Sequence, residues 1–151
     1  MPNEITQAAL LAAIEDATGC TCEAYDGITD EVAVRIPADQ LLAVIGLLRE
    51  QFDCTHLSAI TAQQRETQPG EIELIYHFWR QTGVSVMLTT PRDSPQVASV
   101  ISLIPGADFY EREVAEMFGI IFTGREETRN LLLPDEWNQG PPFIRNEETH
   151  E

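Results

Sequence analysis

Two close pairs of residues carry side chains that could bind a metal ion. Cys20 and Cys22 are two positions apart, and Cys54 and His56 have the same spacing. Because residues two apart in a strand share a face, these four side chains could form a tetrahedral zinc site, as a free-standing zinc-dependent hydrolase would require. The wider cysteine spacing of zinc knuckles is absent, which favours the alternative that the small thiols fill a core. Three cysteines are too few for a four-cysteine iron–sulfur cluster.

Other patterns that support catalysis are missing from the sequence. None of the serines lies in a Gly-x-Ser-x-Gly turn, and no glycine-rich phosphate loop occurs. His77 lies in the apolar stretch 75–79, which is more typical of a hydrogen-bonded strand histidine than of a general base. We therefore expect no catalytic, cofactor-binding or metal-binding residue in this chain.

Charged residues concentrate between Asp108 and Phe118, where the spacing predicts a helix. Its apolar stripe consists of Tyr110, Val114, Met117 and Phe118. The charged residues that fall largely on other faces are Glu111, Arg112, Glu113 and Glu116. An arginine among carboxylates favours ion pairing over acid–base chemistry, and the same charges could equally form a solvated helix face.

The composition restricts the partners of the chain. It has 151 residues, of which 25 are acidic and 9 basic, so its formal net charge is −16. Such a charge repels phosphate backbones and anionic lipid headgroups, which argues against binding to nucleic acid or directly to a membrane surface. Every basic residue is arginine. The absence of lysine excludes a Walker-type phosphate site and Schiff-base catalysis.

The first residues and the cysteines indicate a soluble intracellular protein. The N-terminus lacks the basic region of a signal peptide, and Glu4, Glu15 and Asp16 interrupt its apolar residues. The longest uncharged apolar stretch, 94–107, is too short to span a bilayer and contains two prolines. An odd cysteine count favours reduced thiols. We expect the chain to reach a membrane only through a partner.

Helices and strands alternate in the predicted secondary structure. The sequence predicts helices at 3–19 and 37–51, two short strands within 21–36 around an Asp-Gly turn, and three strands at 55–63, 71–80 and 84–90. A short helix at 96–103 and the charged helix follow, with Gly119 as its stop. The order favours an α+β fold: a two-layer mixed β-sheet of about five strands with helices mainly on one face.

The sequence changes in character after Phe122. Residues 123–151 contain several prolines, yet they also carry the large apolar groups Leu131, Leu132, Leu133, Trp137, Phe143 and Ile144. An extended segment with such groups lies either over its own domain or along another protein. We therefore divide the chain into an α+β domain, 1–122, and an extended, partner-binding C-terminal tail, 123–151.

The charged helix and the tail together carry a family resemblance. The matching strings are Glu111-Arg112-Glu113-Val114, Met117-Phe118-Gly119-Ile120, Phe122-x-Gly124, Arg129 and Leu131-Leu132-Leu133-Pro134-Asp135-Glu136-Trp137. They resemble the respiratory-chain NADH dehydrogenase 30 kDa subunit family of complex I, which includes the equivalent subunit of energy-converting membrane-bound nickel–iron hydrogenases. Looser similarity extends over about residues 37 to 137. The chain departs from the family pattern at Gly124-Arg125-Glu126, where Gly-His-Pro is usual, and at Asn130, which replaces an arginine.

The resemblance implies a non-catalytic scaffold in the peripheral arm of an ion-translocating NADH:quinone oxidoreductase. It implies no cofactor in this chain, with iron–sulfur clusters in neighbouring subunits. The implied partners are the hydrogenase-like large subunit (49 kDa type) and the iron–sulfur small subunit, on the cytoplasmic side of the cell membrane. The implied partner-interface residues are Tyr110, Glu111, Arg112, Glu113, Glu116, Phe118, Gly119, Arg129, Leu131, Leu132, Leu133, Pro134 and Trp137. The hydrogenase or formate hydrogenlyase branch is the alternative.

Overall fold

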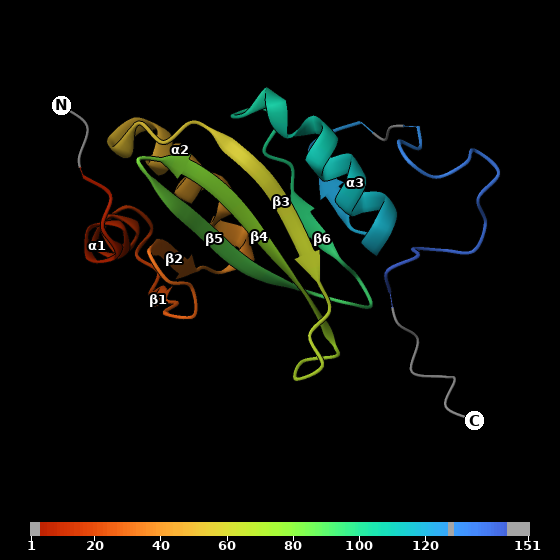
Figure 1. Ribbon diagram of the computed structural model, residues 1–151, viewed down its shortest axis with the longest axis horizontal. Helices are drawn as coiled ribbons and strands as arrows, with labels where there is room; N and C mark the ends of the chain where they lie inside the picture. Colours follow the sequence, from red (N-terminus) through yellow and green to blue (C-terminus); the bar gives the residue numbers. More distant parts are fainter. Residues whose placement is uncertain (1–3, 127–128, 145–151) are drawn as a thin grey trace.

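A five-stranded mixed sheet forms the centre of the computed structural model, which describes residues 4–126 and 129–144 (Figure 1). The strand order is β1-β2-β5-β4-β3, and β2 runs parallel to β5 while the other neighbours are antiparallel. Its strands are β1 (Glu23–Ala24), β2 (Glu31–Arg35), β3 (Leu57–Gln63), β4 (Glu71–Arg80) and β5 (Thr82–Pro91). The α+β prediction with about five strands is confirmed.

Two helices precede the long strands and form the second layer. They are α1 (Gln7–Thr18) and α2 (Leu41–Phe52), the latter introduced by the short 3-10 helix η1 (Ala38–Gln40). Thr6 caps α1 by accepting a hydrogen bond from the Ala9 N–H at 3.1 Å. Gly19 ends the helix with a positive φ of 68°, which only glycine adopts without strain. Both helices agree with their predicted positions.

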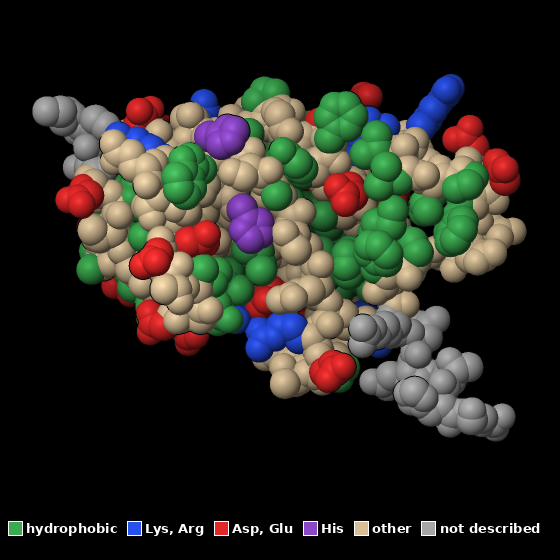
Figure 2. All heavy atoms as spheres, viewed as in Figure 1, with side chains coloured by type: hydrophobic (Ala, Val, Ile, Leu, Met, Phe, Trp, Pro, Cys, Tyr) green, Lys and Arg blue, Asp and Glu red, His purple; other side chains and the backbone are tan. Residues whose placement is uncertain are grey.

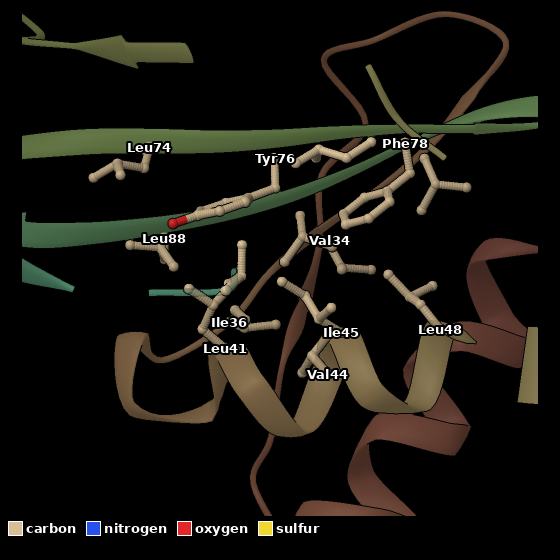
Figure 3. Close-up of a cluster of buried hydrophobic side chains, with 14 of the residues drawn as sticks. Val34, Ile36, Leu41, Val44, Ile45, Leu48, Leu74, Tyr76, Phe78 and Leu88 are labelled. Carbon is tan, nitrogen blue, oxygen red and sulfur yellow. The ribbon is translucent and has the colours of Figure 1, made fainter. Parts of the chain in front are cut away.

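The core lies between α2 and the face of the sheet that this helix covers (Figure 3). Alternate residues of β4 point to this face, so Leu74, Tyr76 and Phe78 are buried together. They meet the apolar stripe of α2, which includes Leu41 and Ile45, both fully buried. The period of two in the strand and the helical spacing in α2 therefore produce one continuous core.

The predicted helix at 96–103 is wrong. Residues Gln96–Ala98 form strand β6, which pairs in parallel with β7 (Ile121–Thr123), and turns follow up to the 3-10 helix η2 (Pro105–Ala107). Val97 and Val100 are buried, and β-branched side chains suit an extended backbone. The hydrogen-bond partners of this segment lie in β7, far along the chain, and helical periodicity within the segment gives no sign of them.

Helix α3 (Asp108–Phe118) lies beside β3, the edge strand of the main sheet, and the two-stranded sheet contacts α3 through β7 and β5 through β6 (Figure 1). Gly119 ends α3 with a φ of 72°, as predicted. Beyond β7 the chain has no helix or strand within the described residues. The division at residue 122 stays a prediction. Among the helices of the described segments, none has the length and apolar character needed to cross a bilayer.

One core side chain carries an unsatisfied polar group. Among the described residues, the buried hydroxyl of Tyr76 has no hydrogen-bond partner. Burial, and then the negative charge of Glu111, raise the pKa of this phenol. We predict that Tyr76→Phe leaves the free energy of unfolding unchanged or raises it by up to about 1 kcal/mol, because an unpaired buried hydroxyl is lost while the ring is kept.

Urea unfolding followed by circular dichroism measures this effect. Tyr76→Ala is the matched control and should lose about 3 kcal/mol or more, since it opens a cavity. A clear loss of stability in Tyr76→Phe would show that the hydroxyl has a partner in solution.

Candidate functional site

The two pairs of metal-binding residues do not come together. Cys22 and Cys54 are buried in the hydrophobic core and Cys20 is half-buried, all three as free thiols. Across the described ranges, no group of three or more histidine, cysteine or acidic side chains could hold a metal ion. Burial raises the pKa of Cys54 to about 11, so its thiol is neutral at physiological pH. The alternative that the cysteines fill a core is confirmed for Cys22 and Cys54, and the geometry of a zinc hydrolase is not formed.

His77 takes part in a row of hydrogen bonds across the sheet. Its Nε2 lies 2.9 Å from Thr61 Oγ1, and its Nδ1 lies 3.5 Å from Ser85 Oγ. Ser85 Oγ donates to Glu31 Oε2 at 3.3 Å. Burial lowers the pKa of His77, although the charge of Glu31 opposes the shift. The arrangement matches the interpretation of a hydrogen-bonded strand histidine, since the serine hydroxyl is engaged by a carboxylate.

The first charged residue of the family string lies inside the domain. Glu111 is 0% exposed, and its Oε1 accepts the Val100 N–H at 2.7 Å. Its Oε2 accepts hydrogen bonds from Ser99 Oγ at 2.7 Å and Arg125 Nη1 at 3.0 Å. The alternative of a solvated helix face is therefore wrong for Glu111, which points inward on the same side as Val114.

Arg125 supplies the positive charge that this burial requires. It also donates a short hydrogen bond from Nη2 to Asp108 Oδ1, so one guanidinium bridges two carboxylates of α3. Burial opposes the charge of Arg125, but the hydrogen bonds to Asp108 and Glu111 and their negative charges outweigh it and raise its pKa. Sequence reasoning missed Arg125. Its position could have indicated this role, because Arg125 departs from the family pattern and places a cation shortly after the acidic helix.

Other charged groups of α3 hold the start of the tail. Glu116 accepts hydrogen bonds from the backbone N–H groups of Leu131 and Leu132, the second at 2.8 Å. Arg112 Nη2 donates to the carbonyl oxygen of Arg129 at 3.3 Å. The charged helix therefore binds the backbone of its own tail, a use that the sequence did not indicate.

The far end of the described tail returns to the C-terminal end of α3 (Figure 1). The Phe143 N–H donates to the Met117 carbonyl at 2.9 Å, and the Phe118 and Phe143 rings meet edge to face at 5.7 Å. A Cβ on Gly119 would lie 2.7 Å from Pro141 Cγ, so the tail needs glycine there. The sequence left open whether the tail lies over its own domain or along another protein. Both ends of the described tail lie over its own domain.

Apolar side chains remain exposed on the outer surface of α3, β7 and the tail. Hydrophobic side chains gather over this part of the molecule in Figure 2. The exposed large ones are Phe109 (62%), Ile121 (55%), Leu132 (59%) and Phe143 (58%), four of the six found in the described segments. We call these four residues the apolar surface. Such groups on one side of a molecule indicate a place where another protein binds.

The remaining predicted interface residues surround this surface. Those exposed are Glu113, Arg129 and Pro134, and those partly buried are Tyr110, Arg112, Glu116, Phe118, Gly119, Leu131, Leu133 and Trp137. Trp137 Nε1 donates to the Gly140 carbonyl at 2.7 Å, so its ring is held by the tail itself. The structure brings all these residues, apart from buried Glu111, to one region. Their contact with another protein stays a prediction.

Removing the cation of the buried pair should destabilise the domain. We predict that Arg125→Ala lowers the free energy of unfolding by about 3 kcal/mol, because the buried Glu111 carboxylate loses its cation. Arg129→Ala, at an exposed arginine nearby, should change it by less than about 0.5 kcal/mol. The double variant Arg125→Met with Glu111→Leu should recover much of the lost free energy of unfolding, measured by chemical unfolding. Normal stability of Arg125→Ala would contradict the role of Arg125 in neutralising Glu111.

The carboxylate of Glu116 should control the order of the tail. We predict that Glu116→Ala speeds amide hydrogen exchange at Leu131 and Leu132 about tenfold, since both N–H groups lose a charged acceptor. The control is Glu113→Ala, which removes an exposed carboxylate from the same helix. Equal exchange in the two variants, measured by NMR, would contradict the contact.

Comparison with known proteins places the chain among respiratory subunits. The model of the family described as "Respiratory-chain NADH dehydrogenase, 30 Kd subunit" matches residues 34–150. The C subunit of the NADH-quinone oxidoreductase of Moorella thermoacetica is 32% identical over 118 residues, which cover 76% of this chain and 78% of the relative. The C subunit of the F(420)H(2) dehydrogenase of Methanosarcina mazei is 33% identical over 130 residues, 82% of each chain. The C/D subunit of the NADH-quinone oxidoreductase of Methylococcus capsulatus is 32% identical over 133 residues, 80% of this chain and 22% of the relative.

Two solved structures share the fold. A chain of the archaeal membrane-bound sulfane sulfur reductase superimposes with a TM-score of 0.66 at 23% identity, covering 85% of this chain and 77% of the other. The trypsin-resistant fragment of Nqo5 gives 0.65 at 21% identity, covering 82% and 100%. The family model and the relatives at about one-third identity decide the membership: the chain belongs to the respiratory-chain NADH dehydrogenase 30 kDa subunit family.

Proposed function

We propose that this chain is a non-catalytic structural subunit in the peripheral arm of a complex-I-like, ion-translocating oxidoreductase of the NADH:quinone type. Family membership supports the type of complex, and the relatives named as NADH-quinone oxidoreductase subunits support the NADH:quinone branch over the hydrogenase branch. The observation that carries the structural role is the apolar surface, which leaves Phe109, Ile121, Leu132 and Phe143 exposed next to the family strings.

The hydrogenase-like large subunit is the partner we propose first. The Methylococcus capsulatus relative is named as a combined C/D polypeptide, and this chain matches only 22% of its length. We take the remainder to correspond to the large subunit, and fusion in one polypeptide favours two neighbours that assemble together. The iron–sulfur small subunit, as second neighbour, follows from the family resemblance. This chain would hold no cofactor, and the iron–sulfur clusters would lie in its neighbours on the cytoplasmic side of the membrane.

The chemistry of the apolar surface suggests how such an assembly is held. Large apolar side chains supply most of the affinity at protein interfaces, whereas charges at the rim steer association and fix the register. Glu113 and Arg129 are exposed beside the apolar surface and suit this second role. A net charge of −16 further requires basic surface on the neighbouring subunits.

Assembly in the native host tests the proposal. We predict that the affinity-tagged chain co-purifies with a large hydrogenase-like subunit and an iron–sulfur subunit, identified by mass spectrometry. Leu132→Asp should reduce their recovery about tenfold or more, because a charge is placed in a desolvated contact. Leu42→Asp is the matched control, since Leu42 is 41% exposed on α2, away from the apolar surface.

A second variant removes residues 131–151. We expect the shortened chain to stay folded by circular dichroism and to lose its partners. Normal recovery of the partners with both Leu132→Asp and the shortened chain would contradict the apolar surface as the contact. Stoichiometric metal, flavin or turnover in the purified chain would contradict a non-catalytic role.

A further inference from the structure

A cavity of about 270 Å³ lies beside α3, between this helix, strand β7 and the segment after it. Arg112 and Ala115 line one side, Ile121 and Phe122 the other, and Arg125 and Arg129 complete it. Three of the nine arginines of an otherwise acidic chain therefore meet in one place. Neither the fold nor the buried pair needs all three.

Two of these arginines have donors to spare. Arg112 donates to the Arg129 carbonyl and lies 3.7 Å from Asp108 Oδ2, but its buried Nε has no hydrogen-bond partner within the described part of the chain. The exposed guanidinium of Arg129 has no hydrogen bond or ion pair with any described residue. A guanidinium carries five N–H donors, so both arginines keep donors that have no acceptor among the described residues.

Three carboxylates line the cavity, and among the described residues none of them, including exposed Glu126, pairs with Arg112 or Arg129. The carboxylate oxygens of Glu111 accept hydrogen bonds from Ser99, Val100 and Arg125. Glu116 uses one oxygen for each of two tail N–H groups. A carboxylate is the group that guanidinium donors bind best, so a partner that supplies one would pair with Arg112 and Arg129.

The other wall of the cavity suits an extended peptide. Among the described residues, β7 has a strand neighbour on one side only, β6. Ile121 is 55% exposed on this strand, while Phe122 lines the cavity. An extended segment can lie along such a strand and place alternate side chains in the adjacent pocket. A free inorganic anion would use the arginines but not this apolar wall.

We propose that the cavity receives an aspartate or glutamate side chain from an extended segment of a neighbouring subunit. Arg112 and Arg129 bind its carboxylate, and an apolar side chain next to it covers Ile121. The inference rests on the proposed function for the identity of the partner as a member of the same complex. It adds a chemical requirement, because the segment that docks here must carry a carboxylate in spite of the acidic character of this chain.

Peptide titration of the full-length chain tests the carboxylate site directly. The probes are acetyl-Val-Glu-Val-amide and the same peptide with glutamine, followed by NMR. The glutamate peptide should shift the amide signals of Ile121 and Phe122 and the Nε–H signals of Arg112 and Arg129, with about tenfold higher affinity than the glutamine peptide. Equal affinities would overturn the proposal, as would acetate binding at the same place as tightly as the glutamate peptide.

Two arginine variants provide the matched control. Arg129→Ala should weaken the glutamate peptide about tenfold, whereas Arg49→Ala, which removes the same charge from an exposed site on α2, should leave it unchanged. Equal effects of the two variants would show that the preference for the glutamate peptide depends only on net charge, which would overturn the proposal. In the native host, Arg129→Ala should also lower recovery of the partner subunits more than Arg49→Ala does.

The two proposals fail in different ways. If Leu132→Asp abolishes co-purification but the peptides bind equally, the structural role stands and the carboxylate site is wrong. If the chain co-purifies with no other protein of such a complex, the proposed function and the assignment of the partner are both wrong, and the titration still decides whether the cavity binds a carboxylate.

Discussion

The ion pair between Glu111 and Arg125 connects three separate segments of the chain. The carboxylate lies on α3, two of its other partners, Ser99 and Val100, follow β6, and the arginine follows β7. A buried carboxylate costs several kcal/mol unless it is paired and fully hydrogen-bonded. The short parallel pair of β6 and β7 therefore depends on a charge inside the domain, and so does the position of the helix that carries the family strings.

Helix α3 uses both of its sides within the chain. Its inner side buries Glu111 and Val114 and carries Phe118, which packs on Phe143, and its outer side holds the tail through Glu116. Because these groups are engaged within the chain, the contact that we propose for a partner lies on the apolar surface and the cavity beside β7. The charged residues of α3 thus stabilise the segments that would contact a partner, namely β7 and the tail.

Arginine fulfils a similar role elsewhere in the structure. Glu73 is 2% exposed on β4 and pairs with Arg35 at 2.9 Å and Arg65 at 3.0 Å, so two cations neutralise one buried carboxylate. A guanidinium is weakly hydrated and binds carboxylates in a fixed geometry, which suits burial better than an ammonium group does. With Arg35, Arg65 and Arg125 committed to internal pairs, much of the acidic surplus of the chain is left without a paired cation.

The sequence by itself determined the elements whose causes are local. Apolar spacing indicated α1, α2 and α3, turn-prone residues marked the ends of β4, and Gly119 marked a helix end, because these signals lie within one turn or one strand. Only the tertiary structure decided that residues 96–98 form a strand, that Glu111 is buried and that Arg125 neutralises it. Each of these depends on hydrogen bonds or charges between segments distant in the chain, and such partners leave no periodic trace in the local sequence.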